Sequence, residues 1–125
     1  MFLLFAQLLA CTNQMELVYG TDACSDWDFD NTEAELRIEE TAEGISISRV
    51  GVERPCDDLF QPEIVADGWR IQITEGWEID VPGDCTACTA PTVELIAPAA
   101  GTYTIQWFEG AEFSTPVHDV EYEVE

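Results

Sequence analysis

The sequence predicts an all-β protein, and three observations support this prediction. Apolar residues alternate with polar or charged residues in six stretches of the chain, which is typical of strands with one buried face. No window has the spacing of three and four residues that marks an amphipathic helix. Four tryptophans, six phenylalanines and three tyrosines provide material for a core despite a formal net charge of −22, so the composition argues against disorder.

Each alternating stretch places apolar side chains on one face and charged or hydroxyl side chains on the other. The apolar residues that define the six strands are, in order, Leu36 and Ile38; Ile45 and Ile47; Trp69, Ile71 and Ile73; Val93 and Leu95; Tyr103, Ile105 and Trp107; and Val120, Tyr122 and Val124. A turn at 42–44 separates the first two strands, and the Asp67-Gly68 turn signal precedes the third.

We expect these strands at 34–40, 45–52, 69–75, 92–97, 102–108 and 117–124. The stretch 62–66 or 77–81 would add an edge strand.

The run from Pro98 to Ile105 narrows the architecture further. Gly101 forms a turn two residues before Tyr103. This pattern resembles the start of strand F in immunoglobulin-like domains, where a tyrosine hydroxyl bonds back to the backbone of the corner. The resemblance covers about 90 residues and implies an immunoglobulin-like antiparallel β-sandwich of about seven strands over residues 34–125. Ile105 replaces the antibody cysteine, so the antibody inter-sheet disulfide is absent; a jelly roll or another sandwich is the alternative.

The N-terminus carries a second resemblance, in the stretch Leu8-Leu9-Ala10-Cys11. The apolar run before Cys11 is too short to span a bilayer and has the length of a signal-peptide hydrophobic region, although no basic residue precedes it. The stretch resembles the lipobox of bacterial lipoproteins. The resemblance implies a signal peptide at 1–10, a lipidated Cys11 and an acidic linker at 11–33. A buried N-terminal strand or helix is the alternative.

Lipidation would hold the protein at a membrane of the bacterial cell envelope through its acyl chains. In these lipoproteins an aspartate directly after the cysteine is linked with retention in the inner membrane. Here that residue is Thr12, so the resemblance favours the outer membrane or cell surface. A looser resemblance to small bacterial lipoproteins rests on Cys56, on Cys85 with Cys88, and on Gly101 with Tyr103. It carries no established activity.

The charge balance excludes one class of partner. The chain has 26 acidic residues and four Lys or Arg residues, all arginine. Binding to phosphate backbones depends on Lys and Arg releasing counterions, so nucleic-acid binding is excluded. The acidic surface is interpreted as a solubility feature; the collection of divalent cations is the alternative.

Four cysteines remain beside Cys11, namely Cys24, Cys56, Cys85 and Cys88. An even number in an exported domain indicates two disulfides, with three possible connectivities. The immunoglobulin-like assignment implies that all four lie at one end of the sandwich, and hence that Cys24 and Cys56 each pair with Cys85 or Cys88. Two alternatives stay open: thiol redox chemistry at the Cys85–Cys88 CxxC spacing, and a four-thiolate metal site.

Asp26, Asp28 and Asp30 have the spacing that opens a calcium loop. Asn31 replaces the required glycine, and Arg37 stands where a bidentate glutamate would close the loop. These three aspartates are therefore a weak calcium candidate. No other cofactor is expected.

Catalysis is not expected. His118 is the only histidine, so multi-histidine metal centres are excluded and a triad would depend on this residue alone. The sequence predicts a non-catalytic, lipid-anchored binding or scaffolding module with an envelope protein or polysaccharide as partner. Its contact surface would be loops at one end of the sandwich, including 109–116 with Phe113. A calcium-binding protein, or a periplasmic thiol or soft-metal protein using Cys85 and Cys88, is the alternative.

Overall fold

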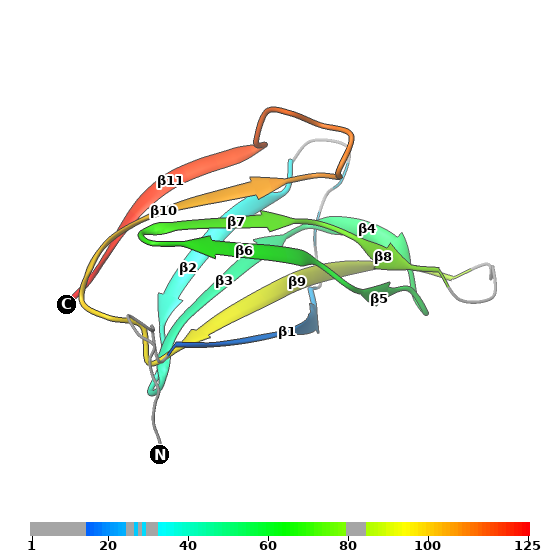
Figure 1. Ribbon diagram of the computed structural model, residues 1–125. Helices are drawn as coiled ribbons and strands as arrows, with labels where there is room; N and C mark the ends of the chain where they lie inside the picture. Colours follow the sequence, from blue (N-terminus) through cyan, green and yellow to red (C-terminus); the bar gives the residue numbers. More distant parts are fainter. Residues whose placement is uncertain (1–14, 25–26, 28, 30–32, 80–84) are drawn as a thin grey trace, which may run out of the picture.

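The computed structural model describes residues 15–24, 27, 29, 33–79 and 85–125. Within these ranges the regular secondary structure consists of β-strands alone. The two larger sheets pack face to face as a β-sandwich (Figure 1). The prediction of an all-β sandwich is therefore confirmed. In the same part of the chain there is no helix that could span a membrane.

Two sheets form the layers, and a short third one lies beside them. The first contains, from edge to edge, β1 (Glu16–Ala23), β9 (Thr86–Ile96), β3 (Gly44–Val50) and β2 (Glu35–Glu40), with β4 (Val52–Pro55) also paired to β9. The second contains β11 (His118–Val124), β10 (Gly101–Phe108), β7 (Arg70–Thr74) and β6 (Glu63–Asp67). The third pairs β5 (Leu59–Phe60) with β8 (Trp77–Glu78).

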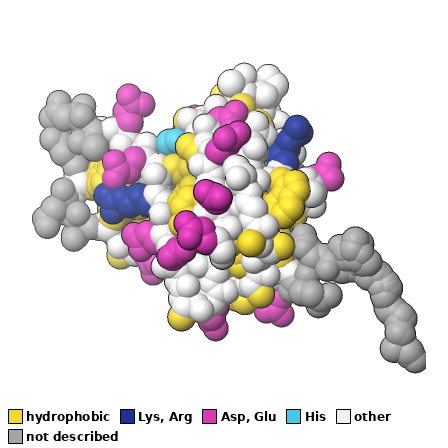
Figure 2. Space-filling model, turned by 90° about the vertical axis from the view of Figure 1, so that its left-hand side faces the viewer, with side chains coloured by type: hydrophobic (Ala, Val, Ile, Leu, Met, Phe, Trp, Pro, Cys, Tyr) yellow, Lys and Arg dark blue, Asp and Glu magenta, His cyan; other side chains and the backbone are white. Residues whose placement is uncertain are grey.

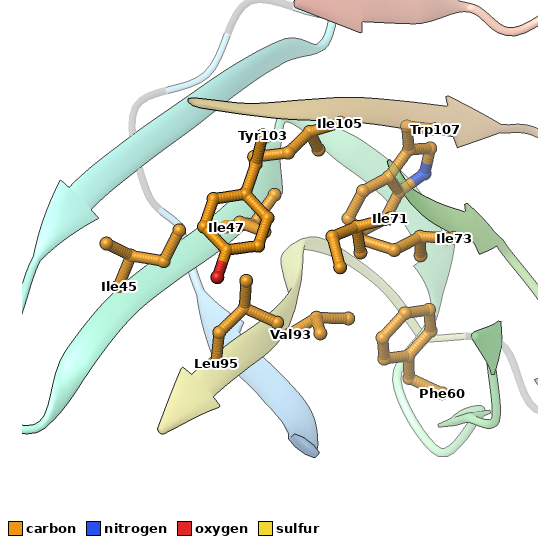
Figure 3. Close-up of a cluster of buried hydrophobic side chains, with 10 residues drawn as sticks. All are labelled: Ile45, Ile47, Phe60, Ile71, Ile73, Val93, Leu95, Tyr103, Ile105 and Trp107. Carbon is orange, nitrogen blue, oxygen red and sulfur yellow. The ribbon is translucent and has the colours of Figure 1, made fainter. Parts of the chain in front are cut away.

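The core lies between the two larger sheets, as the alternating pattern predicts. Side chains point inward from both layers and meet in one cluster (Figure 3). Its members are Ile45 and Ile47 of β3, Val93 and Leu95 of β9, Ile71 and Ile73 of β7, Tyr103, Ile105 and Trp107 of β10, and Phe60 of β5. Successive side chains of a strand point to opposite faces, so the intervening polar residues remain toward solvent.

The tyrosine corner is present. The Tyr103 hydroxyl donates a hydrogen bond to the backbone oxygen of Ala99 at 2.8 Å. Burial raises the pKa of this hydroxyl, partly offset by the bond to Ala99. Trp69 packs edge-on against the Tyr103 ring and also covers Gly101, whose φ of +151° and closeness to the indole leave no room for a Cβ atom. The local motif thus follows the sequence expectation.

The strand directions differ from the expected immunoglobulin-like arrangement. β7 and β10 are parallel neighbours, with Ile71 opposite Ile105 and Ile73 opposite Trp107, whereas immunoglobulin sheets are antiparallel. The tight hairpin from β6 to β7, closed at Asp67–Arg70, gives β6 the edge position and turns β7 back along β10. The expectation of wholly antiparallel sheets is wrong at this pair. Of the two candidate edge strands, the one near 62–66 forms this edge.

The expected linker at 11–33 is wrong over part of its length. Residues Glu16–Ala23 form β1, which pairs with β9 from Glu16 opposite Ile96 to Ala23 opposite Thr89. The folded domain therefore begins well before residue 34. The segment was missed because it lacks the apolar–polar alternation of the other strands. Its place in the sheet is set by antiparallel backbone pairing with β9. β9 begins at Thr86 and is therefore longer than the strand expected at 92–97.

Candidate functional site

Two disulfides cross-link one end of the sandwich. Cys24 bonds to Cys88 and Cys56 bonds to Cys85. Cys24 follows β1, which pairs with β9 from Thr89 to Ile96, and Cys56 follows β4, which pairs with β9 from Thr86 to Thr89. Cys24 and Cys56 each pair with one member of the CxxC pair, which is the pairing that the immunoglobulin-like resemblance implies.

Neither sulfur of the CxxC pair is a free thiol in this arrangement. Thiol redox chemistry and a four-thiolate metal site both require reduced cysteines. The observed bonds therefore give these two alternatives no support.

A groove of about 570 Å³ opens at the same end of the molecule. Its walls come from segments far apart in the sequence, and they carry three aromatic side chains and two arginines. The residues on which the following argument depends are Arg49, Arg54, Glu75, Trp77, Glu109 and Phe113. Phe113 is exposed and lies in the loop between β10 and β11, within the stretch 109–116 that was expected to form a contact surface.

The floor of the groove is fixed by a buried ion pair between the two layers. Arg49, on β3, donates from Nη1 to Oε1 of Glu75 at 3.0 Å, and Glu75 directly follows β7. A second nitrogen, Nη2, lies 3.1 Å from Oε2 of Glu109, which follows β10. One arginine of the first sheet therefore holds the ends of two strands of the second sheet.

Two indoles complete the bonding of the Glu75 carboxylate. Trp77 donates from Nε1 to Oε2 at 2.8 Å, and Trp107 donates from Nε1 to Oε1 at 3.0 Å. A buried charge is tolerated only when it is paired and hydrogen-bonded, and Glu75 meets both conditions. We infer that this carboxylate is a structural group and not a reactive one.

Arg54 forms the second cationic element of the groove. Its guanidinium is ion-paired with Asp58 and lies 4.8 Å from the centre of the Trp77 ring. Stacking of a guanidinium on an indole is a favourable cation–π contact. Trp77 is thereby held between Glu75, which accepts its N–H, and Arg54. Both arginines are paired with carboxylates, so the charge of each guanidinium is already balanced within the protein.

His118 lies opposite Trp107 in the pairing of β10 with β11. Burial lowers the pKa of its imidazole, and the Arg49 charge lowers it further, against smaller opposing effects of Glu109 and Glu75. Its Nε2 atom is buried and has no hydrogen-bond partner in the described residues. An imidazole in this setting favours its neutral form.

A second hollow of about 400 Å³ lies on the outer face of the first sheet. Trp27 lies over Gly51, whose φ of +97° and contact with the indole exclude a side chain at that position. The Arg37 guanidinium is 6.0 Å from the centre of the Trp27 ring. Ser46 and Ser48 of β3 supply hydroxyls beside them. This hollow is lined by both polar and apolar side chains.

Four residues singled out from the sequence lie outside the described part of the structure. They are Cys11, the expected lipidation site, and the calcium candidates Asp26, Asp28 and Asp30. Among the residues that are described, no group of three or more His, Cys, Asp or Glu side chains is placed to hold a metal ion.

The network around Glu75 was missed by the sequence reasoning. One feature of the sequence could have indicated it. The chain has only four arginines, and one of them, Arg49, interrupts the apolar end of a strand. No protein-family model matches the chain, and no curated protein or solved structure matches it either. The site is therefore the basis for any functional assignment.

Proposed function

We propose that the chain is a non-catalytic binding or scaffolding module of the bacterial cell envelope, anchored through an acylated Cys11. The groove at the disulfide-linked end is its contact surface. The observation that carries this proposal is the exposed Phe113 at a groove whose floor is fixed by the buried Arg49–Glu75 pair. Exposed aromatic side chains above a rigid, desolvated base are characteristic of binding hot spots.

Rigidity supports a binding role. Two disulfides hold β1, β4 and β9 together, and the ion pair holds β3 against the ends of β7 and β10. A surface that is ordered before association loses less conformational entropy when a partner binds. The groove is therefore suited to bind a partner surface that is also ordered before association.

The charges of the groove indicate which partners it would favour. Four carboxylates, Glu33, Glu53, Glu75 and Glu109, line it beside the two neutralised arginines. Complementary potentials select partners and repel like-charged ones. An envelope protein with a basic or hydrogen-bond-donating patch, or an uncharged polysaccharide, meets this requirement.

Photo-cross-linking in living cells tests the contact surface. A benzophenone amino acid replaces Phe113 in one strain and Trp69 in another, because these two aromatic residues are equally exposed, at 50% and 51%. Trp69 packs at the tyrosine corner, away from the groove. We expect one discrete adduct from position 113, none from position 69, and loss of the adduct when Glu53→Lys is added. Equal labelling from both positions would contradict the proposal.

The anchor is tested separately by metabolic labelling with palmitate. The wild-type chain is expected to incorporate the label and to sediment with membranes, and a Cys11→Ala variant is expected to do neither. An unlabelled wild-type protein would remove the anchoring part of the proposal and leave the groove untouched.

A further inference from the structure

The strand β1 forms one edge of the first sheet. It pairs with β9 on one side, and no strand in the described part of the chain pairs with its other side. All eight of its residues, Glu16–Ala23, are exposed. In Figure 1 it lies at the margin of its sheet, below β9. The outer edge of such a strand presents unpaired backbone N–H and C=O groups.

β1 differs in the placement of its charges from β2, β6 and β11, the other strands that end the strand orders of the two larger sheets. Charged side chains recur along each of the others: Glu35, Arg37 and Glu39 on β2; Glu63 and Asp67 on β6; and Asp119, Glu121 and Glu123 on β11. Charges at an edge prevent unwanted pairing with other chains. In β1 the five residues from Leu17 to Thr21 carry no charge, and Leu17, Val18 and Tyr19 are all exposed. Among the outer strands of the two larger sheets, as far as the structure describes them, β1 has the longest run without this protection.

A small hollow of about 150 Å³ lies beside this unprotected edge. On the outer face of the sheet, Val18 is opposite Glu94, Gly20 is opposite Thr92, and Asp22 follows on the same face. Nothing lies within 4 Å of the position that a Cβ atom would occupy at Gly20. The hollow thus has a glycine at its base and two carboxylates, Asp22 and Glu94, among its lining residues.

We propose that β1 is a docking edge for an extended segment of another protein, which adds to the sheet as a further strand. Main-chain hydrogen bonds to β1 provide the affinity in this mode of recognition, and pockets for alternate side chains provide the specificity. The hollow above Gly20 takes a Lys or Arg side chain, whose charge meets Asp22 and Glu94. The partner is therefore a basic segment in which lysine or arginine alternates with apolar, β-forming residues.

A second copy of the chain is a poor occupant of this edge. Antiparallel self-pairing about the middle of β1 would bring Glu16 of one copy toward Asp22 of the other. Each copy also carries a net charge of −22, and acidic side chains recur over the face of the molecule shown in Figure 2. Like charges brought together oppose association. The proposal concerns a surface distinct from the groove, and it stands whether or not Cys11 is acylated.

Titration of the full chain with synthetic peptides tests the proposal. The probe is a blocked nine-residue peptide of alternating lysine and valine, and the control peptide has glutamate in place of lysine. With ¹⁵N-labelled protein at about 0.15 M salt, we expect the lysine peptide to shift and protect amides of β1 and its neighbour β9. The glutamate peptide is expected to leave these amides unchanged.

Matched variants locate the binding edge. Val18 of β1 and Val65 of β6 are equally exposed edge valines, at 46% and 48%. Val18→Lys is expected to weaken lysine-peptide binding about tenfold, because it sets a like charge at the docking edge, and Val65→Lys is expected to change it less than twofold. Gly20→Val places its Cβ atom in open space at the base of the hollow, so it is expected to weaken binding while the melting temperature is kept.

Several results would overturn the proposal. One is uniform shifts over the whole acidic surface, which would indicate charge attraction without a site. Another is equal weakening by Val18→Lys and Val65→Lys. Concentration-dependent dimerisation in sedimentation runs that is abolished by Val18→Lys would assign the edge to a second copy. Adsorption to neutral phosphatidylcholine vesicles that is lost in the same variant would assign it to a lipid surface.

Discussion

Arg49 of β3 and Glu75, the residue after β7, join the two layers of the sandwich through a buried ion pair of 3.0 Å. The pair lies at the same end as the two disulfides and forms the floor of the groove. It therefore links the stability of the fold to the shape of the proposed contact surface, and the first prediction follows from it.

Replacement of Glu75 by alanine is expected to lower the free energy of unfolding by about 3–5 kcal/mol, because it leaves the Arg49 charge buried without its main partner. The matched control is Glu35→Ala, which breaks a half-exposed pair with Arg37. Surface pairs contribute about 0–1 kcal/mol, so this change is expected to be small. Urea denaturation of both variants measures the difference. Similar losses in the two variants would contradict the assignment of Glu75 as a buried structural group.

Tyr103→Phe removes the hydrogen bond to Ala99 and keeps the ring in the core. A net loss of about 1–2 kcal/mol is expected, because the carbonyl partner loses its donor. Tyr122→Phe is the control, since the Tyr122 hydroxyl has no hydrogen-bond partner among the described residues. Thermal and urea unfolding of both variants provide the measurement. A Tyr103→Phe protein as stable as the wild type would show that the corner bond makes no net contribution.

His118 gives the protein a pH dependence with a defined sign. Its pKa is lowered below the ordinary value of 6.5 in the folded state, mainly by burial. The unfolded chain therefore binds a proton more readily, so stability is full above about pH 6.5 and falls as the pH drops through the folded pKa. NMR titration of this single imidazole is expected to give a pKa below 6.5. A His118→Gln variant is expected to lose the corresponding part of the pH dependence, and a normal or raised pKa would contradict the account.

The sandwich itself could be predicted from the sequence because its core strands alternate. Ile45 and Ile47, or Ile71 and Ile73, face one layer while their neighbours face solvent, and this periodicity is visible without a structure. The tyrosine corner was likewise visible, since the turn glycine and Tyr103 are close in sequence. Local patterns of this kind are sufficient to specify strands and one turn.

The pairing of strands could not be predicted in the same way. The parallel contact of β7 with β10 depends on the direction in which the β6–β7 hairpin returns, and no pattern within either strand encodes that direction. The strand β1 was missed because its exposed residues do not alternate and its partner β9 lies about 70 residues away. The Arg49–Glu75 pair joins residues from two sheets, so only the packed structure brings it together.

The disulfides are expected to stabilise the fold by restricting the unfolded chain. The sequence separations are 64 residues for Cys24–Cys88 and 29 for Cys56–Cys85. The chain-entropy model gives about 4 kcal/mol for the longer loop and about 3.5 kcal/mol for the shorter one. The double variants Cys24→Ser/Cys88→Ser and Cys56→Ser/Cys85→Ser, compared by denaturation, provide the measurement. A larger loss from the shorter loop would contradict a purely entropic origin.

Peptide mapping under non-reducing conditions, on protein isolated from intact cells after rapid thiol blocking, tests the central claim most directly. If the protein is an exported sandwich that is cross-linked at its groove end, two disulfide-linked peptides are expected. One joins Cys24 to Cys88, and the other joins Cys56 to Cys85. Four alkylated, unlinked cysteines would contradict both the proposed location of the protein and the frame that holds its groove, and a bond between Cys85 and Cys88 would contradict the frame.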